Sequence, residues 1–283
     1  MRRQRGVALL LVLWACTLLA ILLGGYAVLA RTSALQTRYQ FEWTRAHYAA
    51  EAGLMRAIYA MQASDPKQRW SGDGRSYPFA FDGAKVQVSI VDEDGKVDLN
   101  AASPEVLQAL FRAAGLDAPA AARLAANVVD WRSFAGESTQ ADSIRAEYTA
   151  AGRDYGPRHG PFATLEEVQQ VLGMTPELYQ AVEPAITIWS GRAIPDPDTA
   201  PPLALAAIPG LTPQQLQAMQ AARKQNAGAG APPIGGGITH SIRSQAELAD
   251  GTRAVIRATV RLQPGRSGSQ PYTVLRWQEG EGE

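Results

Sequence analysis

Apolar positions dominate the start of the chain and carry no charge over a long stretch. Three arginines, Arg2, Arg3 and Arg5, precede a run of 24 uncharged residues at 7–30. A helix needs roughly 20 apolar residues to cross the core of a bilayer. The first acid is Glu42, and positively charged flanks stay on the cytoplasmic side of a membrane. We therefore expect a single-pass segment in the inner membrane, with a cytoplasmic N-terminus and a periplasmic body.

The helical pattern continues beyond this run. No proline occurs before Pro66, and apolar residues recur at helical spacing through Trp43, Leu54, Ile58 and Met61. One continuous helix over residues 7–62 would be about 84 Å long at 1.5 Å per residue. The alternative is a membrane anchor followed by a separate core helix. We expect the continuous stalk, with these four side chains at the contacts with helices of other subunits.

Strand patterns flank the middle of the chain. Asp82-Gly83 is a two-residue hairpin signal, and apolar and polar residues alternate after it at 85–90. The same alternation returns at 255–262, and a turn at 264–270 leads to a further strand at 272–277. Two strand-rich pieces therefore enclose about 150 residues of different character.

The residues in between are helical and repeat loosely. Each of three units reads as a helix, a turn of glycine and an apolar residue, and a second helix, with the glycines at Gly115, Gly173 and Gly210. This pattern resembles helix-hairpin-helix units, which bind DNA phosphates through a second glycine in the turn. Here Asp117, Thr175 and Thr212 replace that glycine, and residues 98–190 carry twelve acids against six bases. We expect a protein-packing module and no nucleic-acid partner; a membrane-anchored DNA-binding receptor is an alternative.

The boundary before the apolar run has the form of a cleavage site. Basic residues, Gly6 and then an apolar helix resemble a class III, prepilin-type leader, which is cut between Gly6 and Val7. A secretory signal has a shorter apolar core, about 7–15 residues. Two alternatives stay open: an uncut signal anchor, and cleavage after Ala30 that leaves Arg31 as the mature N-terminus.

Several stretches together resemble the type II secretion system minor pseudopilin K, the general secretion pathway protein K family. They match that family in order and spacing over nearly the whole chain. The stretches are Val97-Asp98-Leu99-Asn100, Val129-Asp130-Trp131-Arg132, residues 155–162, Leu165-Glu166-Glu167-Val168, Val171-Leu172-Gly173, Pro184 to Ile188, Asp196 to Leu205 and Tyr272 to Trp277.

The resemblance implies an α+β fold: a pilin-like long N-terminal helix packed on a small antiparallel sheet, with a large all-α insertion of helix-hairpin-helix or SAM-like type. The implied division is a leader at 1–6, the transmembrane half of the helix at 7–30, and the stalk with the first β part at 31–97. The inserted helical domain follows at 98–224, then a linker at 225–237 and the second β part at 238–283.

The resemblance also implies a function. Members of this family assemble the tip of a short pseudopilus that exports proteins across the outer membrane. Prepilin peptidase would cut before Val7 and methylate its new amine, and the partners would be minor pseudopilins of the I and J type and the inner-membrane secretion platform. Most pilins have a glutamate at the position of Leu11, where it offsets the amine of a neighbouring subunit. A tip subunit has no neighbour ahead of it, so a leucine fits there; a minor pilin of a type IV pilus is the alternative.

Calcium is the one cofactor that the resemblance implies. The family's insertion is associated with it, and calcium takes six to eight oxygen ligands. In this chain the acids are thinned to Asp130, Asp142 and Glu147, and the alternative is that these are solvated loop acids and a helix cap. Asp92-Glu93-Asp94-Gly95 has its glycine one residue too early for a calcium loop, so we expect a hairpin turn there.

Catalysis finds no support in the sequence. The chain has no Gly-x-Ser-x-Gly, His-Glu-x-x-His or phosphate-loop motif, and its one cysteine, Cys16, lies in the apolar run. After residue 30 there are 24 basic and 27 acidic residues, which gives no reason to expect an anionic polymer as partner. We expect an assembly protein and no enzyme.

Overall fold

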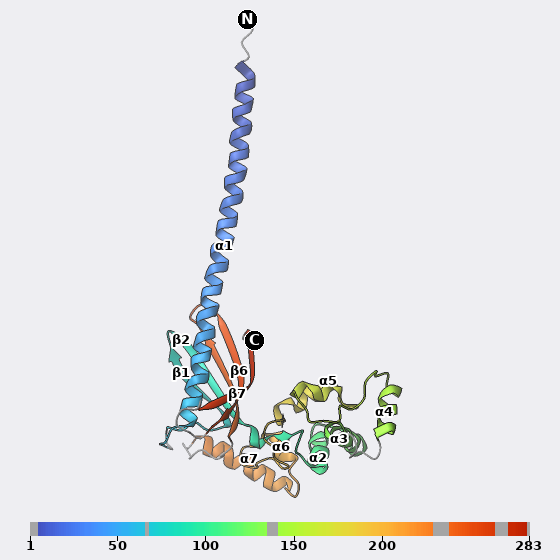
Figure 1. Cartoon of the computed structure of the whole chain (residues 1–283). Helices are drawn as coiled ribbons and strands as arrows, with labels where there is room; N and C mark the ends of the chain where they lie inside the picture. Colours follow the sequence, from blue (N-terminus) through green and yellow to red (C-terminus); the bar gives the residue numbers. More distant parts are fainter. Residues whose placement is uncertain (1–4, 66–67, 135–140, 229–237, 264–270, 282–283) are drawn as a thin grey trace.

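One helix forms the stalk of the molecule. The structure, a computed structural model, describes residues 5–65, 68–134, 141–228, 238–263 and 271–281. Helix α1 runs without interruption over Arg5–Met61, 57 residues (Figure 1). Gly24-Gly25 lies within it and does not break it. The predicted continuous stalk is therefore present.

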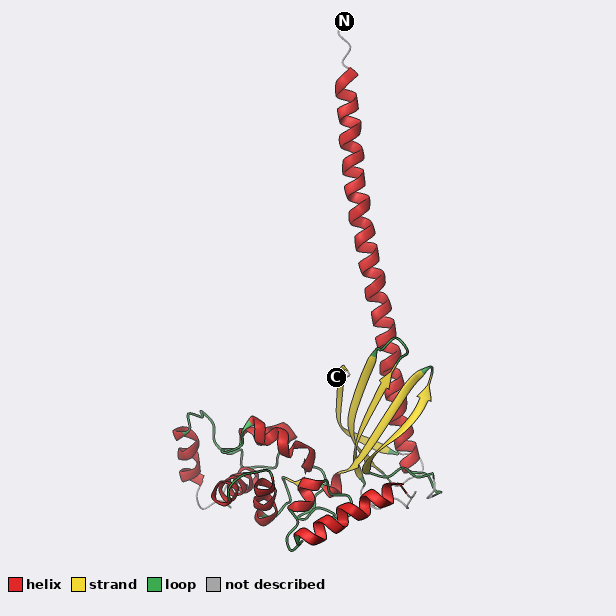
Figure 2. Cartoon of the chain, turned by 180° about the vertical axis from the view of Figure 1, so that it is seen from behind, coloured by secondary structure: helices red, strands yellow, loops and turns green. Residues whose placement is uncertain are grey.

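A five-stranded antiparallel sheet packs against the end of α1 that is far from the N-terminus (Figures 1 and 2). Its order is β1-β2-β5-β6-β7, so the first hairpin and the C-terminal strands meet where β2 pairs with β5. Asp82 and Gly83 have φ of 46° and 78°, which a two-residue hairpin turn requires. The strands are β1 (Asp73–Phe81), β2 (Ala84–Asp92), β5 (Thr239–Glu247), β6 (Arg253–Leu262) and β7 (Tyr272–Glu281).

The core between α1 and the sheet combines small residues and three larger apolar residues on the helix with branched residues on the strands. Gly53 lies at the closest approach: a Cβ there would overlap Ser244 and lie 2.8 Å from Val86 Cγ1. Small side chains let the helix axis come near the sheet, and the branched residues of the strands then fill the space. The buried members are Ala46, Ala49, Ala50, Leu54, Ala57, Ile58 and Met61 on α1, and Val86, Val88, Ile90, Ile242, Ile256 and Val260 on the sheet.

A second unit, built mainly of helices, extends sideways from the end of the sheet that is far from the N-terminus of the chain (Figures 1 and 2). It has its own core around Leu107, Phe111, Leu124 and Trp131. Its elements are α2 (Pro104–Ala113), α3 (Ala118–Arg132), α4 (Ala141–Ala150), the 3₁₀ helices η2 (Leu165–Gln170) and η3 (Glu183–Ala185), α5 (Pro176–Val182), α6 (Pro202–Ala206) and α7 (Pro213–Gly228).

The segment where the chain enters the helical unit pairs with a later segment at the base of that unit, and the two form a short parallel ladder. Strand β3 (Val97–Asp98) pairs with β4 (Ile186–Thr187). The buried carboxylate of Asp98 accepts hydrogen bonds from Gly191 N at 2.7 Å, Asn100 N at 2.8 Å and Ser190 Oγ at 3.2 Å. Residues 92 positions apart are thus held together by one side chain.

Other matched stretches meet at the same place. Asn100 donates to Phe162 O at 3.1 Å and accepts from Phe162 N at 2.7 Å. Arg132 donates to Leu99 O at 2.7 Å and Ala102 O at 2.6 Å. Stretches separated by tens of residues in the sequence therefore fix one another through backbone contacts, which gives them a structural role in the helical unit.

The structure corrects two expectations from the sequence, and a third lies outside the described residues. Residues 225–228, which we expected in the linker, are the end of α7, because the Ala- and Gln-rich sequence before them favours helix. The rest of the expected linker, 229–237, lies outside the described residues. The expected turn at 264–270 also lies outside them. The segment after Asp92 is not a hairpin turn: it is the 3₁₀ helix η1 (Glu93–Gly95), which leads from β2 to β3.

Candidate assembly surface

The first half of α1 is apolar and uncovered. Within the described residues, α1 is the one helix long and apolar enough to cross a membrane. Its large side chains between Leu9 and Leu29 all face outward, and Leu11 is 67% exposed. Removing such a surface from water is strongly favourable, by about 25 cal/mol per Å² of apolar area. This half of the helix therefore fits a single-pass anchor.

The residues of the predicted cleavage site belong to the same helix. Gly6 and Val7 lie in the first turns of α1, and the side chain of Val7 is outside the described part. Cleavage and methylation at Val7 stay predictions, as does the significance of Leu11.

Three of the four side chains that we predicted at contacts with other subunits are covered by the chain's own sheet. Leu54, Ile58 and Met61 are buried against the sheet, so they are not available to helices of other subunits. Trp43 lies above this core, half-buried, with its ring stacked on His47 at a centroid distance of 5.2 Å. The sheet of the same chain therefore covers Leu54, Ile58 and Met61, and a partner contact at Trp43 stays a prediction.

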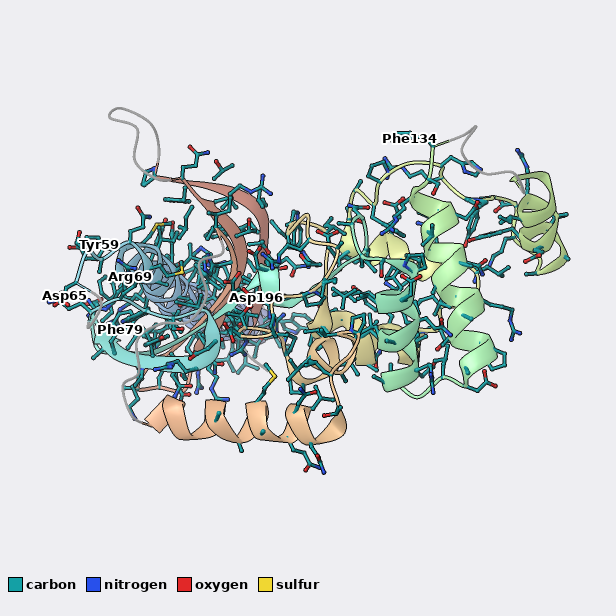
Figure 3. The ribbon with its side chains drawn as sticks, turned by 90° about the horizontal axis from the view of Figure 1, so that it is seen from below. Tyr59, Asp65, Arg69, Phe79, Phe134 and Asp196 are labelled. Carbon is teal, nitrogen blue, oxygen red and sulfur yellow. The ribbon has the colours of Figure 1, made fainter. Side chains whose placement is uncertain are left out.

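A second stripe on the stalk is exposed. Phe41, Tyr48, Met55 and Tyr59 fall within about 40° of one another around the axis at 100° per residue, on the side opposite the buried alanines. Tyr48 is 61% and Tyr59 81% exposed; Figure 3 shows Tyr59 on the outer side of α1. We call these four residues the outer stripe. It is about 27 Å long, and exposed aromatic stripes of this kind mark protein–protein contacts.

The sequence contained this signal. Positions 41, 48, 55 and 59 have helical spacing and three are aromatic. The stripe on the opposite side holds more aliphatic residues, and periodicity alone does not decide which of two stripes a sheet will cover.

The turns of the helical unit cap helices. Gly115, Gly173 and Gly210 have φ of 106°, 95° and 82°, so each needs glycine. The residues that replace the second glycine begin the following helices. Asp117 accepts from Ala120 N at 2.7 Å and Thr175 from Leu178 N at 3.2 Å.

At the third turn the cap is reciprocal. Thr212 Oγ1 accepts from Gln215 N at 3.3 Å, and Gln215 Oε1 accepts from Thr212 N at 2.8 Å. The side chains at all three turns thus satisfy backbone N–H groups that DNA phosphates would otherwise approach.

The three acids proposed for calcium are not shown together. Asp130 is buried at the end of α3, and Glu147 is exposed on α4. The side chain of Asp142 is outside the described part. Among the side chains that are described, no group of three or more His, Cys, Asp and Glu could hold a metal ion. Calcium binding therefore stays a prediction.

A buried polar cluster lies where the sheet meets the helical unit. Glu93 is fully buried and pairs with Lys96 at 2.6 Å, and Asp94 lies near Arg192 at 3.9 Å. Burial lowers the pKa of His240 below its ordinary value, although Glu93 and Asp94 act to raise it. Figure 3 shows the neighbouring Asp196 between the two units. This cluster fixes the helical unit to the base of the sheet.

The comparison with protein families identifies the middle of the chain. Residues 88–191 match the family model "Type II secretion system (T2SS), protein K". The chain is therefore similar to the type II secretion system protein K family over these residues. The matched stretch holds β3, Asp98, α2, α3 and the Asn100–Phe162 contact described above. None of the curated proteins matches the chain.

A solved structure has the same fold. One chain of the crystal structure of the GspK-GspI-GspJ complex from the enterotoxigenic Escherichia coli type 2 secretion system matches with a TM-score of 0.60 and 18% identity. The match covers 87% of this chain and 100% of that chain. The predicted resemblance to the minor pseudopilin K and the predicted α+β, pilin-like fold are confirmed.

Proposed function

We propose that this minor pseudopilin occupies the tip of a type II secretion pseudopilus, where it starts or caps the filament for protein export across the outer membrane. The observation that carries the proposal is the position of the helical unit. It extends sideways at the end of the molecule opposite the N-terminus (Figure 1). A subunit stacked beyond that end would collide with it, so the filament can grow on one side only.

The N-terminal half of α1 supports the same position. The uncovered apolar surface from Leu9 to Leu29 fits a single pass through the inner membrane, with the N-terminus cytoplasmic and the body periplasmic. A carboxylate within a bilayer costs about 2.5–3.5 kcal/mol on insertion scales and needs a partner. Leu11 avoids that cost in a subunit that has no neighbour ahead of it. Prepilin peptidase would expose and methylate Val7.

The outer stripe is the proposed contact with minor pseudopilins of the I and J type. It lies on the face of α1 that the sheet leaves open. Along the helix it follows the apolar first half, so exposed apolar side chains extend from the N-terminal half of α1 to Tyr59. The α1 helix can therefore pack against the helices of neighbouring subunits along its whole length, while the opposite side of α1 stays packed against the sheet. The division into leader, transmembrane half, stalk, inserted helical domain and two β parts belongs to this proposal, as does the absence of an enzymatic activity.

The test is co-purification of the full-length protein with the I and J type pseudopilins of the same cell. Tyr48→Ala together with Tyr59→Ala should reduce the recovered partners at least tenfold and reduce exoprotein release. Phe134→Ala is the matched control, because Phe134 is 60% exposed but lies on the helical unit, far from the stalk (Figure 3). Equal loss in the stripe variant and the control would contradict the assigned contact surface.

Two further measurements separate the alternatives. N-terminal sequencing of the native protein should begin at Val7; a start at Arg31 or at Met1 would exclude the processed pseudopilin. Deletion should abolish exoprotein release; loss of pili or DNA uptake with intact release would indicate a type IV pilus. Retardation of DNA by the protein at low salt would favour the DNA receptor.

A further inference from the structure

A cavity of about 300 Å³ lies between the sheet and the helical unit. Its floor is the face of the sheet that α1 does not cover, and its walls come from the base of the helical unit. Ligand sites are often found at such junctions, and this volume is at the lower end of their range. Four cations, Lys96, Arg243, Arg257 and Arg276, and one acid, Glu183, are among the residues that line it.

Two of the four cations already have partners. Lys96 pairs with Glu93 at 2.6 Å, and Arg276 on β7 pairs with Glu166 of η2. The other two, Arg243 on β5 and Arg257 on β6, form no ion pair or hydrogen bond with any residue that the structure describes. The lining therefore has two uncompensated guanidinium groups at one place.

The sheet register places these two groups side by side. Arg243 is directly opposite Arg257 on the neighbouring strand, and like charges in directly opposite positions destabilise a sheet. Four residues earlier on β6, Arg253 occupies the same face but forms an ion pair with Glu247 at 3.0 Å. Arg253 on this face thus has an acidic partner, whereas Arg243 and Arg257, which line the cavity and are exposed, have none among the described residues.

The remaining walls define the kind of anion. Trp189, Pro184, Ile186 and Leu165 line the side that belongs to the helical unit. An inorganic anion would leave these apolar groups without contacts. Two adjacent guanidinium groups bind a carboxylate through paired, charge-assisted hydrogen bonds. We propose that the cavity binds an organic carboxylate on a short apolar stem, with its oxygens on Arg243 and Arg257 and its stem on the Trp189 side. The carboxylate can belong to a free acid or to the C-terminus of a polypeptide.

The test uses the full-length protein in lipid nanodiscs and butanoate labelled with ¹³C at the carboxyl carbon, followed by NMR line broadening. Butanoate should bind at least tenfold more tightly than acetate, which lacks the stem, and than phosphate. Arg243→Gln or Arg257→Gln should weaken butanoate binding by about tenfold or more. Arg253→Gln is the matched control on the same face of the same strand and should leave binding unchanged.

A second arm identifies the source of the carboxylate. Acetyl-Gly-Val with a free C-terminus should compete with butanoate, and its C-terminal amide should not. Competition assigns the site to a polypeptide terminus, whereas butanoate binding without competition assigns it to a free acid; both support the site. Absent butanoate binding, or binding that Arg257→Gln and Arg253→Gln affect equally, overturns it.

A measurement without ligand gives an independent check. Relief of the repulsion should make Arg257→Gln melt at a higher temperature than wild type at low salt, whereas Arg253→Gln should not. A melting temperature of Arg257→Gln at or below that of wild type at low salt would contradict the uncompensated pair on which the site rests.

Discussion

Replacing Leu54 by alanine tests whether this side of the stalk helix stabilises the fold or contacts other subunits. Leu54 is fully buried between α1 and the sheet, one residue from the close approach at Gly53. A Leu→Ala change at such a position costs about 2–5 kcal/mol, from lost transfer free energy and the cavity that is left. Val86 and Ile256 belong to the same core, and their branched side chains can close the space only partly, so we expect a value of about 3 kcal/mol, within that range.

The assay is thermal unfolding of the full-length protein in nanodiscs, followed by near-UV circular dichroism. A loss of about 3 kcal/mol corresponds to a melting temperature about 6–12 °C lower if the residues after the apolar run, roughly 250 of them, unfold together. Tyr59→Ala is the control on the same helix. Its side chain is 81% exposed, so its free energy of unfolding should change by less than about 0.5 kcal/mol.

Co-purification of minor pseudopilins should separate the two variants. Tyr59→Ala should fold normally and recover fewer minor pseudopilins, whereas Leu54→Ala should lose stability first. If Leu54→Ala melts with the wild type and instead loses its partners, Leu54 faces other subunits and the assignment of the two stripes is wrong.

Three further predictions concern the helical unit and its junction with the sheet. Asp98→Asn should lower the free energy of unfolding by about 1.5–3 kcal/mol, the range for hydrogen bonds to a charged group, and limited proteolysis should then cut the helical unit faster; unchanged cleavage would contradict the role of Asp98. Burial acts to raise the pKa of Glu167, but hydrogen bonds from Ala163 N, Trp131 and Arg158 lower it overall below the ordinary 4.5. Its contribution is therefore complete above pH 4.5 and is lost as the pH falls through the lowered pKa, so Glu167→Gln should be less stable near pH 7 and flatten the acid limb of a stability–pH curve. Burial lowers the pKa of His240 below 6.5, so stability should decrease as the pH falls from 6.5, and His240→Gln should remove that part of the curve; an identical curve would show that the imidazole does not titrate in this range.

The stalk shows how far the sequence determined the fold. The missing prolines and the helical spacing up to Met61 predicted one long helix, and Asp82-Gly83 predicted the hairpin, because both depend on local backbone preferences. The three glycine turns were visible for the same reason: backbone with φ of 82° to 106° favours glycine. The resemblance of the spaced stretches indicated the family before any contact was known.

Which surfaces stay open was decided by the tertiary structure. The stalk carries two stripes at helical spacing, and the sequence favoured the more aliphatic one as the partner surface. The sheet instead covers that stripe, because Gly53 and the alanines beside it allow a closer approach than Tyr48 or Tyr59 would. Likewise, Arg243 and Arg257 read as ordinary solvated positions on two strands. Only the register of β5 with β6, and the helical unit beside them, place two like charges together at the edge of a cavity, where both side chains stay exposed. Local sequence fixes backbone geometry, whereas burial and charge pairing depend on residues that are distant along the chain.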